Sequence, residues 1–106
     1  MAQFDVHRNT GPHKGTTPFV VIVQSSQFDS YRRRVVVPLV RANAVNTARY
    51  APLNPVFKIR GIAVVLHPLD MLSVPVDQLG SEVGSLKEHG TLIMSALDEV
   101  FSQAWH

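Results

Sequence analysis

The fold of this chain is decided by a β-branched run at residues 35–40, Val35-Val36-Val37-Pro38-Leu39-Val40. Valine packs well on a pleated strand and loses side-chain freedom in a helix, so the run predicts a strand. Pro38 has no N–H to donate to a ladder, and we expect it at a strand end, an edge or a bulge. Seven prolines and six glycines in 106 residues also favour short segments separated by turns over a helical bundle.

Further strands are predicted on both sides of this run. They cover residues 2–6, 19–24, 55–59 and 62–66. Turn-forming residues fill 9–15, which predicts a hairpin with a long loop between the first two strands. Arg60-Gly61 separates the last two runs and predicts a tight turn.

The periodicity changes after His67-Pro68. Residues 73–79 have a proline where a helix would start, and we expect one or two helical turns there. Ser85 and Glu88 have capping-box spacing, which predicts the start of a C-terminal helix running almost to His106. The apolar stripe of this helix consists of Leu86, Gly90, Ile93, Leu97, Phe101 and Ala104. Antiparallel strands followed by one helix predict an α+β fold.

Length and composition indicate one folded domain spanning residues 1–106. Hydrophobic residues make up 45% of the chain and charged residues 17%, which excludes a disordered protein. There are no cysteines, which excludes disulfides and cysteine-based zinc sites. The apolar runs are far shorter than the ~20 residues of a membrane span, so we expect a soluble, cytoplasmic protein with no membrane partner.

Charge is distributed unevenly along the chain. Residues 1–60 carry nine Lys and Arg against two acids, a balance of +7, whereas residues 61–106 carry Lys87 against six acids, a balance of −5. The two halves therefore either pair with each other or leave a basic face for an acidic partner.

Catalytic motifs are not recognisable in the sequence. His67 and Asp70 are three residues apart, and His7 and His13 are six apart, and neither spacing matches a known metal or hydrolase motif. The sequence has no P-loop and no paired-carboxylate signature. We therefore expect no catalytic residues, no metal and no cofactor.

Several short motifs follow one another along nearly the whole chain. In order, they are Gln3-Phe4-x-Val6, Val23-Gln24-Ser25 followed by Asp29, Arg33-Arg34-x-Val36-x-Pro38-Leu39, Pro55-Val56-x-x-Ile59, Asp70-Met71-x-Ser73-Val74-Pro75-Val76, Gly80-x-x-Val83, and Ala96-Leu97 with Phe101. Each motif is weak alone, but the ordered set is specific. In order and spacing the chain resembles the CcdB family, the toxin half of a type II toxin–antitoxin pair.

The resemblance implies an SH3-like antiparallel barrel of about five main strands, a C-terminal helix and a homodimer. It implies inhibition of DNA gyrase by binding the GyrA subunit and trapping the cleaved-DNA complex, and neutralisation by a CcdA-type antitoxin, with operator DNA bound only together with that antitoxin. Transferred by position, the gyrase-binding residues are Gln27, Phe28, Phe101, Trp105 and His106. The antitoxin-binding residues expected in the basic half are Arg8, Lys14, Arg41 and Arg49.

In the family a Trp directly follows this Phe, whereas three residues separate Phe101 from Trp105 here. Three residues are nearly one helical turn, so on a continuous helix the Trp105 ring lies ~5 Å further along the axis than its family counterpart. A large aromatic beside a chain end is exposed unless something covers it. It either packs on its own barrel or dimer partner, or contacts gyrase, and the resemblance favours gyrase.

Two other functions stay open. The same small barrel is shared with MazF-type endoribonucleases, for which the Arg32–Arg34 cluster and His67 are the candidate residues. A non-toxic CcdB homologue that only binds antitoxin and represses its own operon is the second alternative.

Overall fold

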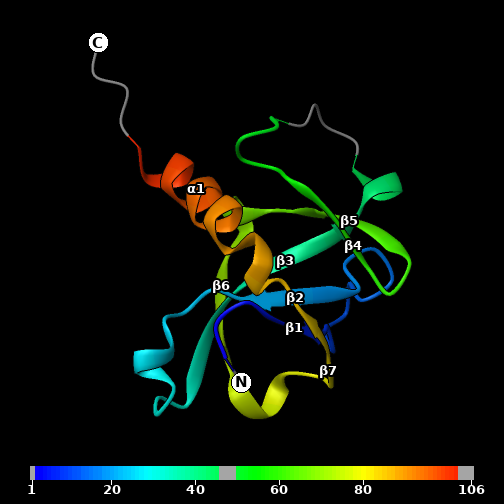
Figure 1. Cartoon of the computed structure of the whole chain (residues 1–106). Coiled ribbons are helices and arrows are strands. Elements are labelled where there is room, and N and C mark those ends of the chain that lie inside the picture. Colours follow the sequence, from blue (N-terminus) through cyan, green and yellow to red (C-terminus); the bar gives the residue numbers. More distant parts are fainter. Residues whose placement is uncertain (1, 46–49, 103–106) are drawn as a thin grey trace.

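The computed structural model describes residues 2–45 and 50–102, which form a curled antiparallel sheet with one helix against one of its faces (Figure 1). The strands are β1 (Asp5–Arg8), β2 (Phe19–Ile22), β3 (Arg33–Arg41), β4 (Val56–Ile59), β5 (Ile62–Leu66), β6 (Leu72–Pro75) and β7 (Glu82–Ser85). The helix is α1 (Gly90–Phe101), and short 3₁₀ turns lie at Ser26–Phe28, Ala42–Ala44, Pro68–Asp70, Val76–Gln78 and Lys87–His89. The predicted α+β fold with a C-terminal helix is confirmed.

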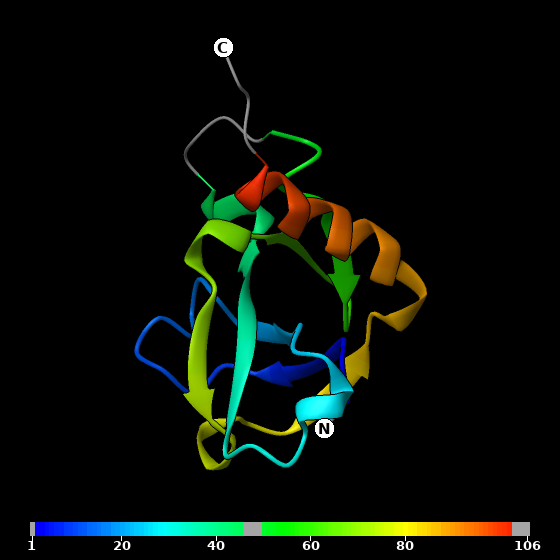
Figure 2. The same ribbon diagram turned by 90° about the vertical axis from the view of Figure 1, so that its left-hand side faces the viewer.

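β3 organises the sheet. The strand order is β4-β5-β3-β2-β1-β7, and β6 also pairs with β3. One edge of β3 pairs with β2, while its other edge pairs with β6 over residues 33–36 and with β5 over residues 39–41. Because two strands share one edge of β3, the sheet curls into a partial barrel, which Figure 2 shows from the side.

Pro38 lies inside β3 rather than at an end, an edge or a bulge, so that prediction was wrong. The Val23 N–H donates to the Val35 carbonyl, so the hydrogen-bonded pairs of the ladder with β2 fall on every second residue of β3 starting from Val35. Pro38 lies between two such residues, and its nitrogen therefore points away from β2. On the other edge, Pro38 falls between the last β6 pair and the first β5 pair. The missing N–H therefore falls where no strand needs a donor.

The first predicted strand is shifted along the chain. Residues 3 and 4 form a turn, Phe4 has φ 72°, and β1 begins only at Asp5. The predicted strands at 19–24, 55–59 and 62–66 correspond to β2, β4 and β5. The tight turn at Arg60-Gly61 is also confirmed, with φ values of 51° and 80° that suit a type I′ hairpin.

The C-terminal third differs from the prediction in three ways. β6 and β7 were not predicted, although the helical turn expected within residues 73–79 is present as the 3₁₀ turn Val76–Gln78. α1 begins at Gly90, although the Ser85 hydroxyl does accept a hydrogen bond from the Lys87 N–H at 3.2 Å. α1 ends at Phe101, because Ser102 has extended backbone with ψ 140°.

The main core lies between α1 and one face of the sheet. It combines residues of the helix, such as Ile93 and Leu97, with sheet residues such as Val21, Val37 and Leu39. A smaller cluster of Val20, Ile22 and Val36 lies on the opposite face. Within the described part of the chain, no helix is long and apolar enough to cross a membrane.

Candidate functional site

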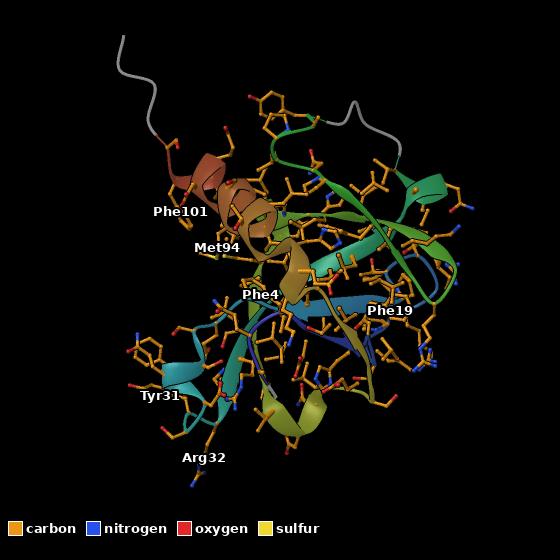
Figure 3. The ribbon with its side chains drawn as sticks, viewed as in Figure 1. Phe4, Phe19, Tyr31, Arg32, Met94 and Phe101 are labelled. Atoms are coloured by element: carbon orange, nitrogen blue, oxygen red, sulfur yellow. The ribbon has the colours of Figure 1, made fainter. Side chains whose placement is uncertain are left out.

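The loop between β2 and β3 presents an aromatic pair to solvent. Phe28 ends the 3₁₀ turn at Ser26–Phe28 and leaves 43% of its surface exposed. Its ring meets that of Tyr31 edge to face, with 5.9 Å between centroids and an interplanar angle of 84°. Gln27 is exposed beside it. The predicted loop pair is thus on the surface, and the exposed apolar area extends to Tyr31, which the sequence had not singled out as a contact (Figure 3).

The buried guanidinium of Arg34 fixes the backbone of this loop. Arg34, only 5% exposed, donates from Nη1 to the Tyr31 carbonyl at 2.6 Å and from Nη2 to the Asp29 carbonyl at 2.7 Å. Its Nε lies 3.9 Å from the Asp29 carboxylate. Gln24 adds a bond from Nε2 to the Phe28 carbonyl at 3.1 Å. The loop backbone is therefore fixed before any partner arrives.

The end of α1 carries the second predicted contact. Phe101 is 72% exposed although it continues the apolar stripe of the helix, and Met94 is partly exposed two turns earlier. Figure 3 shows both side chains on the same side of the molecule as Tyr31. Trp105 and His106 lie outside the described residues. The helix was expected to run almost to His106, but α1 ends at Phe101.

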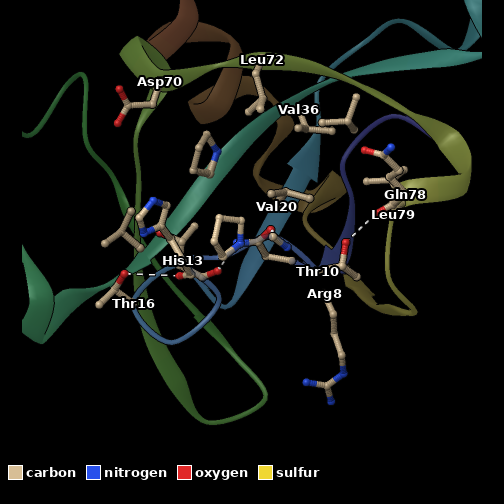
Figure 4. Close-up of a pocket in the computed structure, with 17 residues that line it drawn as sticks. Arg8, Thr10, His13, Thr16, Val20, Val36, Asp70, Leu72, Gln78 and Leu79 are labelled. Carbon is tan, nitrogen blue, oxygen red and sulfur yellow. Dashed lines mark hydrogen bonds between the residues drawn. The ribbon is translucent and has the colours of Figure 1, made fainter.

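A pocket of about 440 Å³ opens on the sheet face opposite α1 (Figure 4). Its apolar lining includes Val20, Val36, Pro38, Val40, Leu72, Val74 and Leu79. The polar rim consists of Arg8 at the end of β1, Thr10 and His13 of the β1–β2 loop, and Asp70. The Thr10 hydroxyl donates to the Gln78 carbonyl at 2.7 Å and ties this loop to the segment after β6.

Three of the four basic residues expected to bind antitoxin lie around this loop. Arg8 lines the pocket, Lys14 lies within the loop, and Arg41 donates from Nε to the Gly15 carbonyl at 2.9 Å. Arg49 lies outside the described residues. Among the residues that the structure describes, Arg34 pairs with Asp29 of its own half, and His67 Nδ1 lies 3.9 Å from Asp70 of its own half. Within these residues no Lys or Arg of the first half forms a salt bridge with an acid of the second half.

The residues considered for a ribonuclease are not assembled. Arg34 is buried under the loop, and Arg33 bonds the Ser73 hydroxyl at 2.9 Å and its carbonyl at 2.8 Å. The His67 N–H donates to the Pro38 carbonyl, which places His67 beside the middle of β3, while Arg33 begins that strand. Five strand residues span roughly 16 Å. The Arg32–Arg34 cluster and His67 therefore do not form one site.

Solved structures share this fold. An endoribonuclease in complex with its cognate antitoxin, from a mycobacterial species, superposes with a TM-score of 0.75 at 17% identity, covering 100% of this chain and 99% of that chain. A mycobacterial endoribonuclease gives 0.73 at 17%, covering 100% and 95%. The Mycobacterium tuberculosis toxin MazF-mt6 gives 0.72 at 16%, covering 95% and 99%. At these identities the likeness establishes the fold alone.

The curled sheet closed by one helix is therefore an architecture found among small toxins. The model of the family described as CcdB protein matches residues 3–102, and the chain belongs to the CcdB family. This membership makes it a toxin of a toxin–antitoxin system.

Proposed function

We propose that this toxin inhibits DNA gyrase by binding the GyrA subunit and trapping the cleaved-DNA complex, and that a CcdA-type antitoxin neutralises it. The observation that carries the proposal is the exposed Phe28–Tyr31 pair on a loop that Arg34 fixes from below. A rigid, exposed aromatic pair suits binding, because little side-chain freedom is lost when a partner covers it. Phe101 supplies a second exposed ring on the same side of the molecule (Figure 3).

The direct test is gyrase supercoiling with purified components, with and without the protein. Inhibition with accumulation of cleaved DNA supports the proposal. Phe28→Ala should weaken inhibition by about tenfold or more, because aromatic anchors of this kind commonly contribute about 1.4 kcal/mol or more to binding. Tyr50→Ala is the matched control, since Tyr50 is also an exposed aromatic, at 55%, but lies on the β3–β4 connection. Equal effects of both variants would contradict a specific surface around Phe28.

For the antitoxin, we propose that an acidic segment with apolar anchors lies over the pocket on the face opposite α1. The apolar lining suits the anchors, and the basic side chains of Arg8, Lys14 and Arg41, which form no salt bridge among the described residues, suit the acidic residues. Arg8→Glu should weaken binding of the cognate antitoxin and lower its dependence on salt. Arg60→Glu is the control, because it makes the same change of charge in the β4–β5 turn, where Arg60 donates to the Val83 carbonyl of β7. Salt-insensitive binding would exclude the basic rim as the docking surface.

We also propose that the protein is a homodimer. The large side chains of the apolar runs at residues 35–40 and 62–66 are mostly buried within one chain, so these runs do not supply the dimer surface. The apolar side chains exposed to a second copy are instead residues such as Leu69, Leu72 and Met94. Sedimentation at micromolar concentration tests this assembly, and a monomer would contradict it.

A ribonuclease is the second candidate function, and one observation favours it. His13 and Asp70 line the same pocket, so two groups able to move protons border one cavity. Incubation with pure RNA tests this activity. Cleavage that is lost in His13→Ala would support it. Antitoxin binding with neither cleavage nor gyrase inhibition would identify a non-toxic homologue that acts in operon repression.

A further inference from the structure

Three potential metal ligands meet where β1 pairs with the edge strand β7. Asp5 and His7 alternate along β1, and Glu82 of β7 lies directly across from His7. The ligand atoms of the three side chains all lie within 4.8 Å of one another. The register shifts between Val6 and His7, and such irregularities re-aim side chains relative to a regular ladder.

His7 is the unusual member of this cluster, because it is only 4% exposed. Its Nδ1 lies 2.8 Å from the Gly80 carbonyl, and a carbonyl can only accept, so Nδ1 carries the proton. In the neutral ring Nε2 then holds a free lone pair. Nε2 is buried and has no hydrogen-bond partner in the part of the chain that the structure describes. A buried nitrogen of this kind is costly unless something binds it.

The backbone that holds the ring is closely packed. Gly80 donates to the Arg8 carbonyl at 3.1 Å, and the Arg8 N–H donates to the Ser81 carbonyl at 2.9 Å. A Cβ on residue 80 would lie 2.6 Å from the Arg8 carbonyl oxygen, so only glycine fits this approach. The Gly80 carbonyl thus fixes the tautomer and orientation of His7, as backbone carbonyls commonly do for metal-binding histidines.

We propose that Asp5, His7 and Glu82 bind one divalent transition-metal ion, with Zn²⁺ as the best match. Ligand atoms about 2.0–2.2 Å from one tetrahedral ion lie about 3.3–3.6 Å apart, so the most widely separated atoms of the cluster must approach each other by up to about 1.5 Å, a shift that rotation of the exposed Glu82 side chain supplies. None of the three side chains forms a salt bridge among the described residues, so no opposite charge already engages their ligand atoms. Imidazole with carboxylates suits zinc better than magnesium or calcium, which prefer oxygen ligands alone.

The ion would join the edge strand to the body of the sheet. β7 pairs only with β1 in the described sheet and leads through a 3₁₀ turn into α1. Glu82 is exposed, so a fourth position can hold water. Asp5 already accepts a bond from the Ala2 N–H at 2.8 Å through Oδ2, which leaves Oδ1 for the ion.

The test is calorimetric titration of the chelator-treated, untagged full chain with zinc chloride. We expect one ion per chain, at least about tenfold weaker binding in Asp5→Asn and in Glu82→Gln, and a zinc-dependent rise in melting temperature only where binding persists. Glu88→Gln, an exposed acid in the turn before α1, is the control and should leave affinity unchanged. These isosteric variants avoid the buried His7, whose removal could unfold the chain.

Each result decides the proposal. A change in the ¹⁵N shift of His7 Nε2 on adding zinc would place the ion on that nitrogen. Zinc that binds Asp5→Asn and Glu82→Gln as tightly as the unaltered chain resides on other histidines, and this result overturns the proposal. Absence of zinc binding overturns it as well.

Discussion

Val36 and Val37 are neighbours on β3 and are both fully buried, yet they belong to different parts of the molecule. Val37 packs in the large core beneath α1, whereas Val36 belongs to a cluster of three buried residues and borders the open pocket. The helix face therefore supplies most of the stability. The opposite face leaves apolar surface accessible beside basic side chains, which is what a binding surface requires.

Ile93→Ala is expected to be the most damaging change, because it opens a cavity in the helix-side core. Ile93 is fully buried, and such truncations cost about 3 kcal/mol of unfolding free energy. Leu92→Ala is the matched control on the next residue of α1, with Leu92 44% exposed, and should cost less than about 1 kcal/mol. Denaturant unfolding of both variants measures the difference, and equal losses would mean that α1 does not dock as described.

Arg34→Met is expected to rank second, with a loss of about 2 kcal/mol. The substitution keeps much of the side-chain volume but leaves the partly buried hydrogen bonds to the Asp29 and Tyr31 carbonyls without their charged donor. Arg33→Met, which removes bonds to Ser73 at the surface, should cost less than about 1 kcal/mol. If Arg34 positions the loop, Arg34→Met also weakens gyrase inhibition while Arg33→Met does not. A variant with unchanged stability would show that the loop holds its shape without the guanidinium.

Val37→Ala and Val36→Ala compare the two faces directly with the same substitution in the same strand. We expect about 2 kcal/mol for Val37 and about 1 kcal/mol for Val36, because the space left by Val36 joins an existing pocket instead of forming a closed cavity. Strand propensity cancels between the two variants. Urea unfolding with equal slopes tests the ranking, and a reversal would mean that the pocket face carries the main core.

The sequence predicted the elements whose pattern is local. The valine-rich runs identified β2, β3 and β5, and Arg60-Gly61 identified the hairpin turn, because side-chain shape and φ preference act within a few residues. β7 escaped prediction because Glu82–Ser85 has neither alternation nor β-branched density, and only its pairing with β1 makes it a strand. Pro38 was misplaced because its tolerance depends on two partners that share one edge of β3.

The candidate sites also differ in how far the sequence could predict them. Phe28 and Phe101 could be singled out by position, and both prove to be exposed. The basic rim around the β1–β2 loop was expected from charge, but its pocket also requires β6, which the sequence did not predict. The cluster of Asp5, His7 and Glu82 joins residues 75 positions apart through the pairing of β1 with β7, so no spacing motif could indicate it.

Phe101→Ala is expected to have the smallest effect on stability and tests whether the end of α1 serves binding. The ring is 72% exposed, so its removal should change the unfolding free energy by less than about 0.5 kcal/mol. Leu97→Ala, one turn earlier on α1 but buried in the core, should instead destabilise the protein by about 2 to 3 kcal/mol. If the end of α1 contacts gyrase, Phe101→Ala lowers inhibition by up to about thirtyfold, the equivalent of about 2 kcal/mol of binding, at an unchanged melting temperature. Inhibition assays and melting curves on the same preparations separate the outcomes, since a large fall in melting temperature would make Phe101 a packing residue. Full inhibition by Phe101→Ala would restrict the gyrase contact to the Phe28 loop and to residues after Ser102, with Trp105→Ala as the next variant.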